Sequence, residues 1–542
     1  MLLCIGTGNT VAQLSEKERA DISKNLDIYV SIFNEMVMNY VDSVPIEKTI
    51  QNSINTMLHR FDPYTEYIAQ EDMTNFTFMT SGEYGGIGSI ITMRDSSVVI
   101  KEPYENMPAA LAGLRPGDRL LEVDGTDLKG QDTAFTSNLL RGQPNTQVKI
   151  KYLRPGEKKP CEVGIDRKRI HVDPVVYYGV IKDKVGYIYL SNFTTESSQS
   201  VKAAYTDLVN NRNIESLIID VRDNGGGVVE DCLVMLNYFL PRGTLLLSMK
   251  GRTPQSERTY RATQEPIDTA IPLAIMVNGN SASASEILSG AIQDWDRGIV
   301  VGSRTYGKGL VQSTAVLPYD GRLKLTTAKY YIPSGRSIQT IDYAQRDEQG
   351  RVTSIPDSLT TDYYTAHNRL VKDGSGILPD FVVEDDNVPT IVLYMDLGQY
   401  FFDFVVDWRV KHPKIASPEE FILTDDIYNE FKEHISNTDF TYDLGSERVM
   451  QTLKRTMEME GYWNEASTEY AELEELLKPN LKRDLELHKK PISRYLAYEI
   501  MLQYYHQKGK HIYAIRDDVQ LDKAVEVIED KELYSGTLQA EE

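Results

Sequence analysis

Cysteine and long apolar runs are scarce in this chain, and histidine is missing from its middle. The 542 residues include only three cysteines, Cys4, Cys161 and Cys232. Three cysteines cannot all pair and their spacing fits no metal site, so no disulfide framework is expected. No run of about 18 apolar residues occurs, so no membrane-spanning helix is expected. No histidine lies between His171 and His367, so a general base in that stretch would have to be another residue type.

Positive charge is also in short supply. The chain has 58 Lys and Arg residues against 80 Asp and Glu residues, a formal net charge of −22. Phosphate backbones need a basic surface, so nucleic acid is not expected as a partner. The content of 41% hydrophobic and 25% charged residues is typical of globular proteins, and the length suggests three or four structural units.

Residues 1–13, MLLCIGTGNTVAQ, allow two interpretations. The segment Thr10-Val11-Ala12 fits the small-residue cleavage site of a secretion signal, but the positive segment is absent and the apolar run is short. The stretch is therefore either the remnant of a secretion signal or a plain chain terminus.

Composition divides the rest of the chain into four regions. Residues 14–80 have apolar side chains at roughly helical spacing and end with the turn-bearing FDPYTEYI at 61–68. Residues 82–170 combine Gly-rich turns, short strands and helices, which predicts a compact α+β module. Residues 171–388 alternate apolar strands with helices, which predicts an α/β layer. Residues 389–542 have the pattern of amphipathic helices. Taken together, the four regions give an expected fold class of α/β (α+β multidomain).

The segment GSRTYGKG at 302–309 matches all but the last position of the phosphate-loop pattern G-x-x-x-x-G-K-[ST]. That position must be Ser or Thr to ligate Mg²⁺, and here it is Gly309. The loop must also open a helix, whereas the following LVQSTAVLP is rich in β-branched residues and favours a strand. A nucleotide site is therefore not expected, and Lys308 needs another interpretation.

Ser283 lies where the apolar strand IPLAIMVNGN gives way to the helical SASASEILSGAIQDW. A serine at such a junction lies beside free backbone N–H groups, which can stabilise an oxyanion. The alternative is structural, because Ser283-Ala284-Ser285-Glu286 is also a capping-box pattern that would only start the helix.

Lys308 is the candidate base for that serine. A lysine can take this role where burial lowers its pKa enough to make it neutral. Lys308 and Gln312 would point to the same side of a strand, so the Gln312 amide is a candidate to orient the amine. The alternative is a solvated lysine beside a polar strand residue.

The stretch SASASEILSGAIQDWDRGIVVGSRTYGKGLVQ resembles the catalytic segment of the carboxyl-terminal processing proteases, also called tail-specific proteases. That family uses a serine nucleophile and a lysine base 25 residues later, a spacing that pairs Ser283 with Lys308. Asp294 and Gln312 match two further family positions. FDPYTEYI, DVRDNGGG and TTAKYYIPSGRSI extend the resemblance over about residues 60–385.

The resemblance also implies roles around the nucleophile. The oxyanion hole would use the N–H of Ala284 and that of Gly226 or Gly227, in a loop where the family often has Asn-Pro-Gly-Gly and this chain has Asn-Gly-Gly-Gly. Asp294 is expected to support the fold rather than transfer protons, with Arg297 as its candidate partner. No metal and no other cofactor is implied.

The module at 82–170 resembles a PDZ domain. The resemblance assigns peptide binding to Gly85, Gly86, Ile87, Gly88, Ser89, Ile90, Phe135 and Leu139. The Gly-rich segment would receive a terminal carboxylate, the two residues after it would begin the edge strand that a peptide joins, and the two helical side chains would line the groove. The alternative for the glycines is a tight turn at the entry to a strand.

The activity implied is that of a serine endopeptidase. It would recognise C-terminal tails through the PDZ-like module and cleave them by a Ser-Lys dyad with an acyl-enzyme intermediate. The alternative is a catalytically silent, PDZ-bearing scaffold that binds peptides. The expected partners are polypeptides with exposed C-terminal tails, and the terminal helical regions are candidates for homo-oligomer contacts. The family works outside the bacterial cytoplasm, so the periplasm or cell envelope is the expected location.

Overall fold

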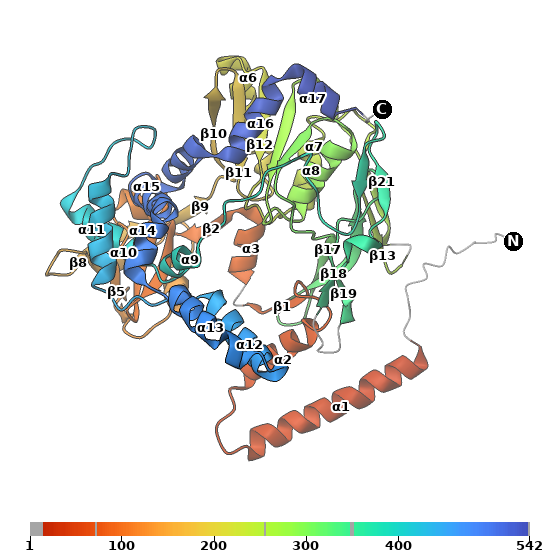
Figure 1. Ribbon diagram of the computed structural model, residues 1–542. Coiled ribbons are helices and arrows are strands. Elements are labelled where there is room, and N and C mark those ends of the chain that lie inside the picture. The colour runs from red at the N-terminus through yellow and green to blue at the C-terminus, as the bar shows by residue number, and fades with distance from the viewer. Residues whose placement is uncertain (1–14, 71–72, 254–255, 347–351, 540–542) are drawn as a thin grey trace.

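The structure is a computed structural model that describes residues 15–70, 73–253, 256–346 and 352–539. Its sheets and helices form a PDZ module, a mixed α/β core and a C-terminal helical region, preceded by N-terminal helices (Figure 1). This arrangement confirms the expected fold class. The stretch suspected of being a secretion signal lies outside the described residues. Within them, no helix is both long and apolar enough to cross a membrane.

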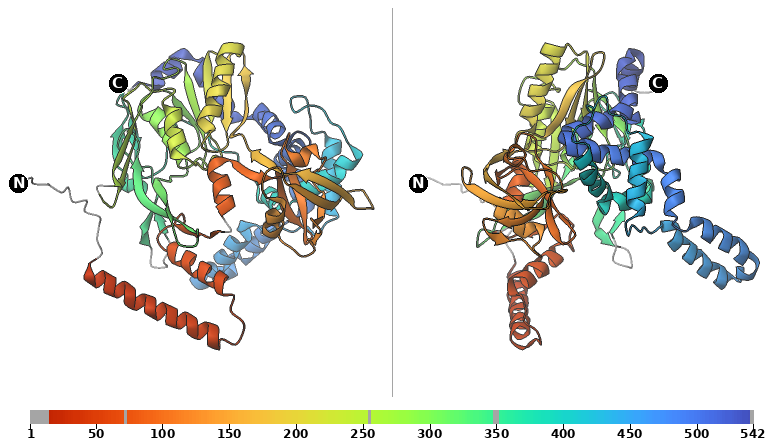
Figure 2. Two further views of the ribbon diagram at one scale, coloured as in Figure 1. Left: turned by 180° about the vertical axis from the view of Figure 1, so that it is seen from behind. Right: turned by 90° about the vertical axis from the view of Figure 1, so that its left-hand side faces the viewer.

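The N-terminal region contains helices and one short strand. Its elements are α1 (Glu16–Asn39), α2 (Ile46–Leu58), β1 (Glu66–Ile68) and α3 (Met73–Ser81). Helix α1 has no buried residue and projects away from the body of the molecule (Figures 1 and 2). Strand β1 pairs antiparallel with β18 (Arg322–Tyr331). The stretch at 61–68, expected to contain a turn, thus also supplies an edge strand to a sheet of the α/β core.

The PDZ module is built on an antiparallel sheet in the order β3-β4-β5-β7-β8, which makes β3 an edge strand. The hairpin that joins β5 to β6 turns at Asp124-Gly125, where both residues have positive φ, as a two-residue type I′ turn requires. The elements of the module are β2 (Glu83–Gly86), β3 (Ser89–Arg94), β4 (Ser97–Pro103), α4 (Pro108–Leu111), β5 (Arg119–Val123), β6 (Thr126–Asp127), α5 (Thr133–Leu140), β7 (Gln147–Leu153), β8 (Cys161–Asp166) and β9 (Lys168–His171).

The α/β core contains a six-stranded sheet in the order β10-β11-β12-β15-β16-β23, parallel from β11 onward. Its central strands SLIID and LAIMV are buried throughout, as expected for parallel strands covered on both faces. The carboxyl ends of these strands share one edge, where functional loops of such sheets gather. The elements are β10 (Val175–Lys182), β11 (Val185–Leu190), α6 (Ser197–Arg212), β12 (Ser216–Asp220), α7 (Val229–Leu236), β15 (Leu273–Val277), α8 (Ala284–Asp294), β16 (Ile299–Gly302) and β23 (Phe381–Val382).

A second, antiparallel sheet lies beside this core, in the order β1-β18-β13-β14, with β17 also paired to β18. Strand β17 follows Lys308 directly, as the β-branched sequence predicts, and no helix begins there. The remaining elements of this part are β13 (Leu245–Gly251), β14 (Arg258–Arg261), β17 (Leu310–Val316), β19 (Ile341–Arg346), β20 (Val352–Ser354), the 3₁₀ turn η3 (Asp357–Leu359), β21 (Asp362–Tyr364) and β22 (Leu370–Lys372).

The C-terminal region is helical, as expected, but it is not a separate body. Helices α12 and α13 form a hairpin that projects from the molecule (Figure 2). Helix α16 instead packs on the six-stranded sheet, so the core expected at 171–388 is incomplete without it. The elements are α9 (Thr390–Leu397), α10 (Tyr400–Lys411), α11 (Asp425–Ser436), α12 (Gly445–Glu460), α13 (Trp463–Leu477), α14 (Leu481–Leu487), α15 (Lys489–Ala514), η4 (Ile515–Asp517), α16 (Val519–Glu529) and α17 (Lys531–Thr537).

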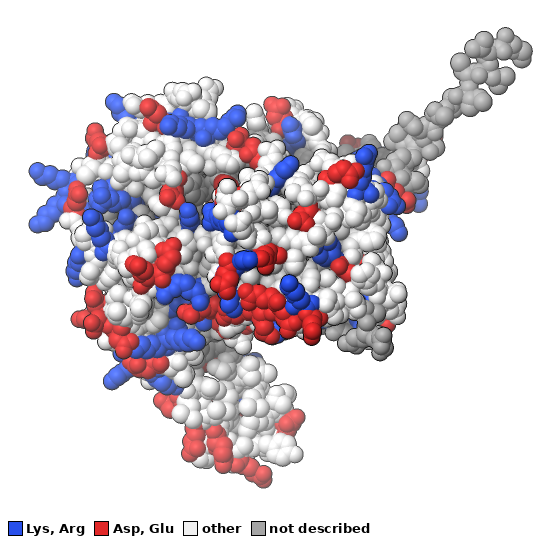
Figure 3. Space-filling model, turned by 90° about the horizontal axis from the view of Figure 1, so that it is seen from above, with Lys and Arg blue, Asp and Glu red and all other residues white. Residues whose placement is uncertain are grey.

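The surface charge is unevenly distributed. On the face seen in Figure 3, acidic side chains gather in patches and interrupt the basic ones. The negative charge is therefore not spread evenly over this face, on which basic and acidic groups alternate.

Candidate active site

Ser283 lies at the start of α8 in a strained backbone conformation. Its φ of 56° and ψ of −112° are values that a residue with a side chain rarely adopts. Such strain is held in place by surrounding contacts and is frequent at functional sites. Here Ser281 Oγ donates to Val221 O over 2.7 Å, and Ala282 N donates to Asn224 O over 3.0 Å. The loop before the serine is thus fastened to the loop that follows β12.

A buried carboxylate joins the serine to the segment that contains Lys308. Glu286 Oε2 accepts hydrogen bonds from Ser283 N (2.8 Å) and Lys308 N (2.9 Å), while Oε1 accepts from Thr305 Oγ1 (2.6 Å) and Gly307 N (2.8 Å). Burial raises the pKa of Glu286 to about 7, although these donors act in the opposite direction. The two predicted catalytic residues therefore share one backbone anchor.

Tyr330 of β18 forms a second connection between the same two residues. Its hydroxyl is buried and lies within hydrogen-bond distance of Ser283 O, at 3.2 Å, and of Lys308 O. Its backbone N–H donates to Gly309 O over 3.0 Å. The backbone at Lys308 and Gly309 is therefore held both by Glu286 of α8 and by Tyr330 of β18.

The Lys308 side chain is partly buried and lies on an aromatic face. Its Nζ is 4.2 Å from the centre of the Tyr64 ring. Burial lowers the pKa of Lys308, and the nearby charge of Lys324 lowers it further, against the opposing effects of Glu286 and Asp62. Within the described residues, no hydrogen bond joins Lys308 Nζ to a Ser283 atom. Burial thus makes the neutral amine easier to reach than in water, while the contact with the Tyr64 ring stabilises the charged form.

Gln312 lies on β17, and no hydrogen bond joins its side chain to Lys308 in the part of the chain that the structure describes. Its Nε2 donates to Thr326 Oγ1 on β18 over 3.1 Å. The backbone N–H of Thr326 in turn donates to Thr65 Oγ1 over 3.2 Å, beside the turn that contains Tyr64. The structure therefore brings Gln312 near the site through β18, and its predicted contact with Lys308 stays a prediction.

The glycine loop lies directly against the serine. A Cβ on Gly226 would lie 2.8 Å from Ser283 Cβ and 2.9 Å from Ala284 N, so no other residue fits there without displacement. The Gly226 N–H donates to Asn224 Oδ1 over 2.9 Å. By contrast, the N–H groups of Ala284 and Gly227 have no acceptor among the described residues.

Asp294 is a structural carboxylate, but its partner is not the predicted one. It is buried and forms an ion pair with the buried Arg336 over 2.8 Å, and it accepts from Ser334 N over 2.9 Å. Arg297 instead donates to backbone carbonyl oxygens, including those of Phe239 and Ile271. The expected pairing with Arg297 is therefore wrong, because its guanidinium is bonded to these carbonyl oxygens.

We expect Asp294→Asn to lower the stability of the α/β core by about 3 kcal/mol, because removal of one partner leaves a buried guanidinium uncompensated. The measurement is the shift of the urea unfolding midpoint relative to wild type. As a control, Asp294→Leu combined with Arg336→Met removes both charges and is expected to cost less than Asp294→Asn alone. A loss below about 1 kcal/mol for Asp294→Asn would contradict the structural role.

The PDZ positions are only partly as predicted. Gly85 and Gly86 lie within strand β2, paired with Arg169 and Lys168 of β9, and not in the loop that follows it, and their predicted role in receiving a carboxylate stays a prediction. Gly85 is needed there because a Cβ would lie 2.2 Å from Gly142 O. Ile87 and Gly88 form the short connection to the edge strand β3, which begins with Ser89 and Ile90.

The groove beside β3 is lined differently from the prediction. The small hollow between β3 and α5 is lined by Tyr84, Ile87, Ser89, Ile91, Ser137, Leu140 and Arg141. Phe135 is exposed and Leu139 packs against the module core, so neither is among the lining residues. The stretch is helical, as expected, but the sequence did not indicate which face of that helix meets the groove.

Three residues of the site were not identified as functional from the sequence. Glu286 was noticed only as part of a capping pattern, which is half of its role. Tyr64 lies in FDPYTEYI and Tyr330 in TTAKYYIPSGRSI, two segments that carried the family resemblance without any role for their tyrosines. For the two tyrosines the only signal was motif membership, because they are far from Ser283 in sequence, and for Glu286 the missing information was its contact with the distant Lys308 segment.

Comparisons with known proteins agree with this organisation. Residues 184–346 match the family described as "Peptidase family S41", residues 99–154 a "PDZ domain", and residues 391–528 a "Probable PDZ-protease, C-terminal helical domain". A "Carboxy-terminal-processing protease" of Bartonella bacilliformis is 33% identical over 321 residues, which cover 59% of this chain and 73% of the relative.

Other relatives are more distant or less completely covered. A "Probable CtpA-like serine protease" of Staphylococcus aureus is 31% identical over 331 residues, covering 60% of this chain and 64% of the relative. Among solved structures, a photosystem II D1 C-terminal processing protease shares 26% identity with a TM-score of 0.36, covering 66% of this chain and 86% of that one. On its sequence similarity, the chain belongs to the carboxy-terminal-processing protease family of serine peptidases, with an embedded PDZ domain.

Proposed function

We propose that the chain is an endopeptidase that cleaves polypeptides near their C-terminal tails, with Ser283 as nucleophile and Lys308 as base. The observation that carries this proposal is the shared anchor of the two residues. A single buried carboxylate, Glu286, accepts hydrogen bonds from the backbone N–H groups of both. A nucleophile also needs a base that can be neutral, and burial lowers the pKa of Lys308 in that direction.

In the proposed reaction, neutral Lys308 takes the Ser283 hydroxyl proton as Oγ attacks the scissile carbonyl carbon. The resulting oxyanion is stabilised by the N–H of Ala284 together with that of Gly226 or Gly227. Lys308 then gives its proton to the leaving amine, and water hydrolyses the acyl-enzyme by the same route in reverse order. For the first step, the amine must leave the face of Tyr64 and approach Ser283, with Gln312 as a candidate to orient it.

The PDZ module is proposed to select the tail. A peptide would extend the sheet at β3, with its carboxylate near the N–H groups of Gly88 and Ser89. These N–H groups lie against the Tyr84 hydroxyl, where they partly offset the rise that burial causes in its pKa. Arg141 lines the same hollow with its guanidinium 5.4 Å from the Tyr84 ring centre, so a cation lies beside the proposed carboxylate position.

We expect a peptide with a free C-terminal carboxylate to be cleaved with a KM about 10-fold lower than that of its C-terminal amide, because only the carboxylate can form charge-assisted hydrogen bonds. Arg141→Ala is expected to remove most of this difference, measured by mass spectrometry of the products. Lys129→Ala, an exposed residue of the same module, is the matched control. Equal KM values for acid and amide in the wild-type chain would overturn tail recognition.

The alternative is a scaffold that binds tails without cleaving them. Binding of the same peptide by the wild-type chain, with no product over long incubation, would favour that alternative. Self-association is proposed through the terminal helices, because α1 exposes apolar side chains along its length, including Ile22, Leu26 and Ile32. The proposed location, the periplasm or cell envelope, follows from the family resemblance.

A further inference from the structure

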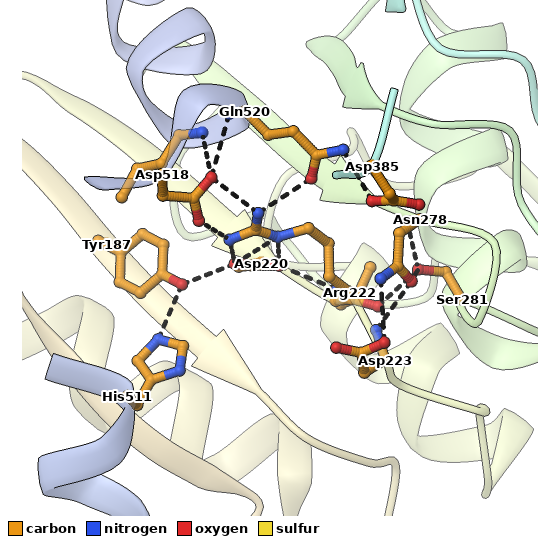
Figure 4. A network of polar contacts seen from close by, with 12 residues as sticks. Tyr187, Asp220, Arg222, Asp223, Asn278, Ser281, Asp385, His511, Asp518 and Gln520 are labelled. Atoms are coloured by element: carbon orange, nitrogen blue, oxygen red, sulfur yellow. Dashed lines mark hydrogen bonds and ion pairs between the residues drawn. The ribbon is translucent and has the colours of Figure 1, made fainter. Parts of the chain in front are cut away.

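Helix α16 is far from the catalytic residues in sequence but packs on the sheet that carries them. Leu521, Ala524 and Val525 share a buried apolar cluster with residues of β11, β12, β15 and β16. The helix begins at the carboxyl edge of that sheet, beside the loops that follow β12 and β16. Two side chains at its N-terminal end, Asp518 and Gln520, contact Arg222 in the loop after β12, and Gln520 also contacts Asp385, which is bonded to the loop after β16 (Figure 4).

Asp518 holds the loop that follows β12. Its carboxylate caps α16 by accepting from Gln520 N and Leu521 N, each at 3.0 Å. It also accepts from Arg222 in a two-point contact, with Nη1 at 3.0 Å and Nη2 at 2.6 Å. The other side of the Arg222 guanidinium donates to the fully buried Asp220. Arg222 is thus held between two carboxylates, one from the sheet and one from α16.

The chain runs directly from Arg222 into the contacts that position the nucleophile. Asp223 N donates to Asn278 Oδ1 and Asn278 Nδ2 donates to Asp223 Oδ1, each over 3.0 Å. The next carbonyl, Asn224 O, accepts from Ala282 N and from Ser285 Oγ, on either side of Ser283. A shift of Arg222 would therefore move the loop that lies against the serine.

Gln520 reaches toward the other catalytic loop. Its Oε1 accepts from Arg222 Nη1 over 3.0 Å, and its Nε2 donates to Asp385 Oδ1 over 3.0 Å. The second oxygen of Asp385 accepts from Ser303 Oγ over 2.7 Å. Ser303 begins the segment that leads to Lys308. The same turn of α16 is thus connected to the nucleophile side and to the base side.

A third contact comes from the preceding helix. His511 of α15 lies within 2.9 Å of the Tyr187 hydroxyl, and that hydroxyl donates to Asp220 Oδ2 over 2.6 Å. The rings of His511 and Tyr189 also stack, with centres 4.0 Å apart. Asp220 is therefore supported by the C-terminal region as well as by its own strand.

We propose that the first turn of α16 positions the catalytic centre, with Asp518 holding the nucleophile-side loop through Arg222 and Gln520 holding the base-side loop through Asp385. The inference rests on the proposed peptidase function and deepens it. Asp518 and Gln520 are positioning residues, because they act through other side chains. The C-terminal helical region is then required for the chemical step and not only for shape.

The test is Asp518→Asn, because asparagine still caps a helix but removes one acceptor and the charge that face Arg222. We expect kcat for peptide cleavage to fall about 10-fold with KM within about twofold of wild type, since neither side chain is placed in the peptide groove. Labelling of Ser283 by a fluorophosphonate reagent is expected to slow by a similar factor. Asp518→Glu, which keeps the charge, is expected to recover part of the rate.

The controls separate positioning from folding. Asp522→Asn changes an exposed carboxylate in the same turn and is expected to leave kcat unchanged. If Asp518→Asn does not fold, Gln520→Leu provides the second variant, with an expected kcat loss of about threefold to 10-fold. An unchanged kcat in an active enzyme, or a loss that only follows the folded fraction, overturns this proposal alone. A wild-type chain that neither cleaves nor reacts with the reagent overturns the proposed function as well.

Discussion

Ser283→Ala is expected to reduce peptide cleavage by at least about 10³-fold, because the acyl-enzyme cannot form without the hydroxyl. Lys308→Met is expected to have an effect of similar size, since methionine fills the same space but cannot take a proton. Residues that act as one catalytic unit are not additive, so the double variant is expected to be no slower than the slower single variant. The measurement is kcat on a peptide with a free C-terminus, with products identified by mass spectrometry.

The matched control is Lys324→Met, which removes a second lysine close to the first. Lys324 forms an ion pair with Glu66 at 2.9 Å, and its charge helps to lower the pKa of Lys308. Its removal is expected to leave the maximal rate nearly unchanged and to raise the pKa of Lys308. The acid limb of the rate profile should then move to higher pH. Retained activity in Lys308→Met would contradict the role of that lysine as base.

The pH dependence follows from the same assignment. Only the neutral amine can take the serine proton, so activity is expected to fall on acidification as Lys308 gains a proton, while the fold persists. Circular dichroism recorded across the same pH range checks that condition. A rate that falls only together with unfolding would argue against a lysine base.

How far the sequence predicts this site depends on the distance over which each contact acts. The pairing of Ser283 with Lys308 was predicted because both lie in one motif at a fixed spacing. The sequence also predicts the turn at Asp124-Gly125 and the strand after Lys308, because both follow from local backbone preference. Contacts between residues far apart in the sequence could not be predicted in this way. The partner of Asp294 proved to be Arg336, a residue of another motif, and not the nearby Arg297.

The C-terminal region shows the same limit more clearly. The spacing of its apolar residues predicts amphipathic helices correctly. The spacing does not show which surface of the protein each apolar face packs against. Helix α16 covers the six-stranded sheet, and Asp518 reads in sequence as an ordinary helix cap. Its second contact, to Arg222, depends on packing between two segments that are 296 positions apart in the sequence.

Glu286→Gln is expected to reduce kcat by about 10²-fold, through loss of alignment between the proposed nucleophile Ser283 and the proposed base Lys308. The carboxylate accepts four hydrogen bonds, two at each oxygen. A glutamine replaces one oxygen by an NH₂ group, so two backbone or hydroxyl donors would face another donor in a buried site. The matched control is Glu230→Gln, an exposed acid in the first turn of α7, which is expected to retain full activity.

The raised pKa of Glu286 leads us to expect that stability and activity change in opposite directions with pH. Its pKa is raised from the ordinary value of 4.5 to about 7 in the folded chain, so the folded state binds the extra proton between these values. Its contribution to stability is therefore present at low pH and is lost as pH rises through about 7, a change of up to about 3 kcal/mol. The aligned site needs the ionised form, so activity is expected to rise over the range in which this stability is lost. The measurement is the urea unfolding midpoint at about pH 5.5 and at about pH 8.5. The difference between these two midpoints should be smaller in Glu286→Gln than in wild type. If the difference is the same in both proteins, Glu286 is not the source of the pH dependence of stability.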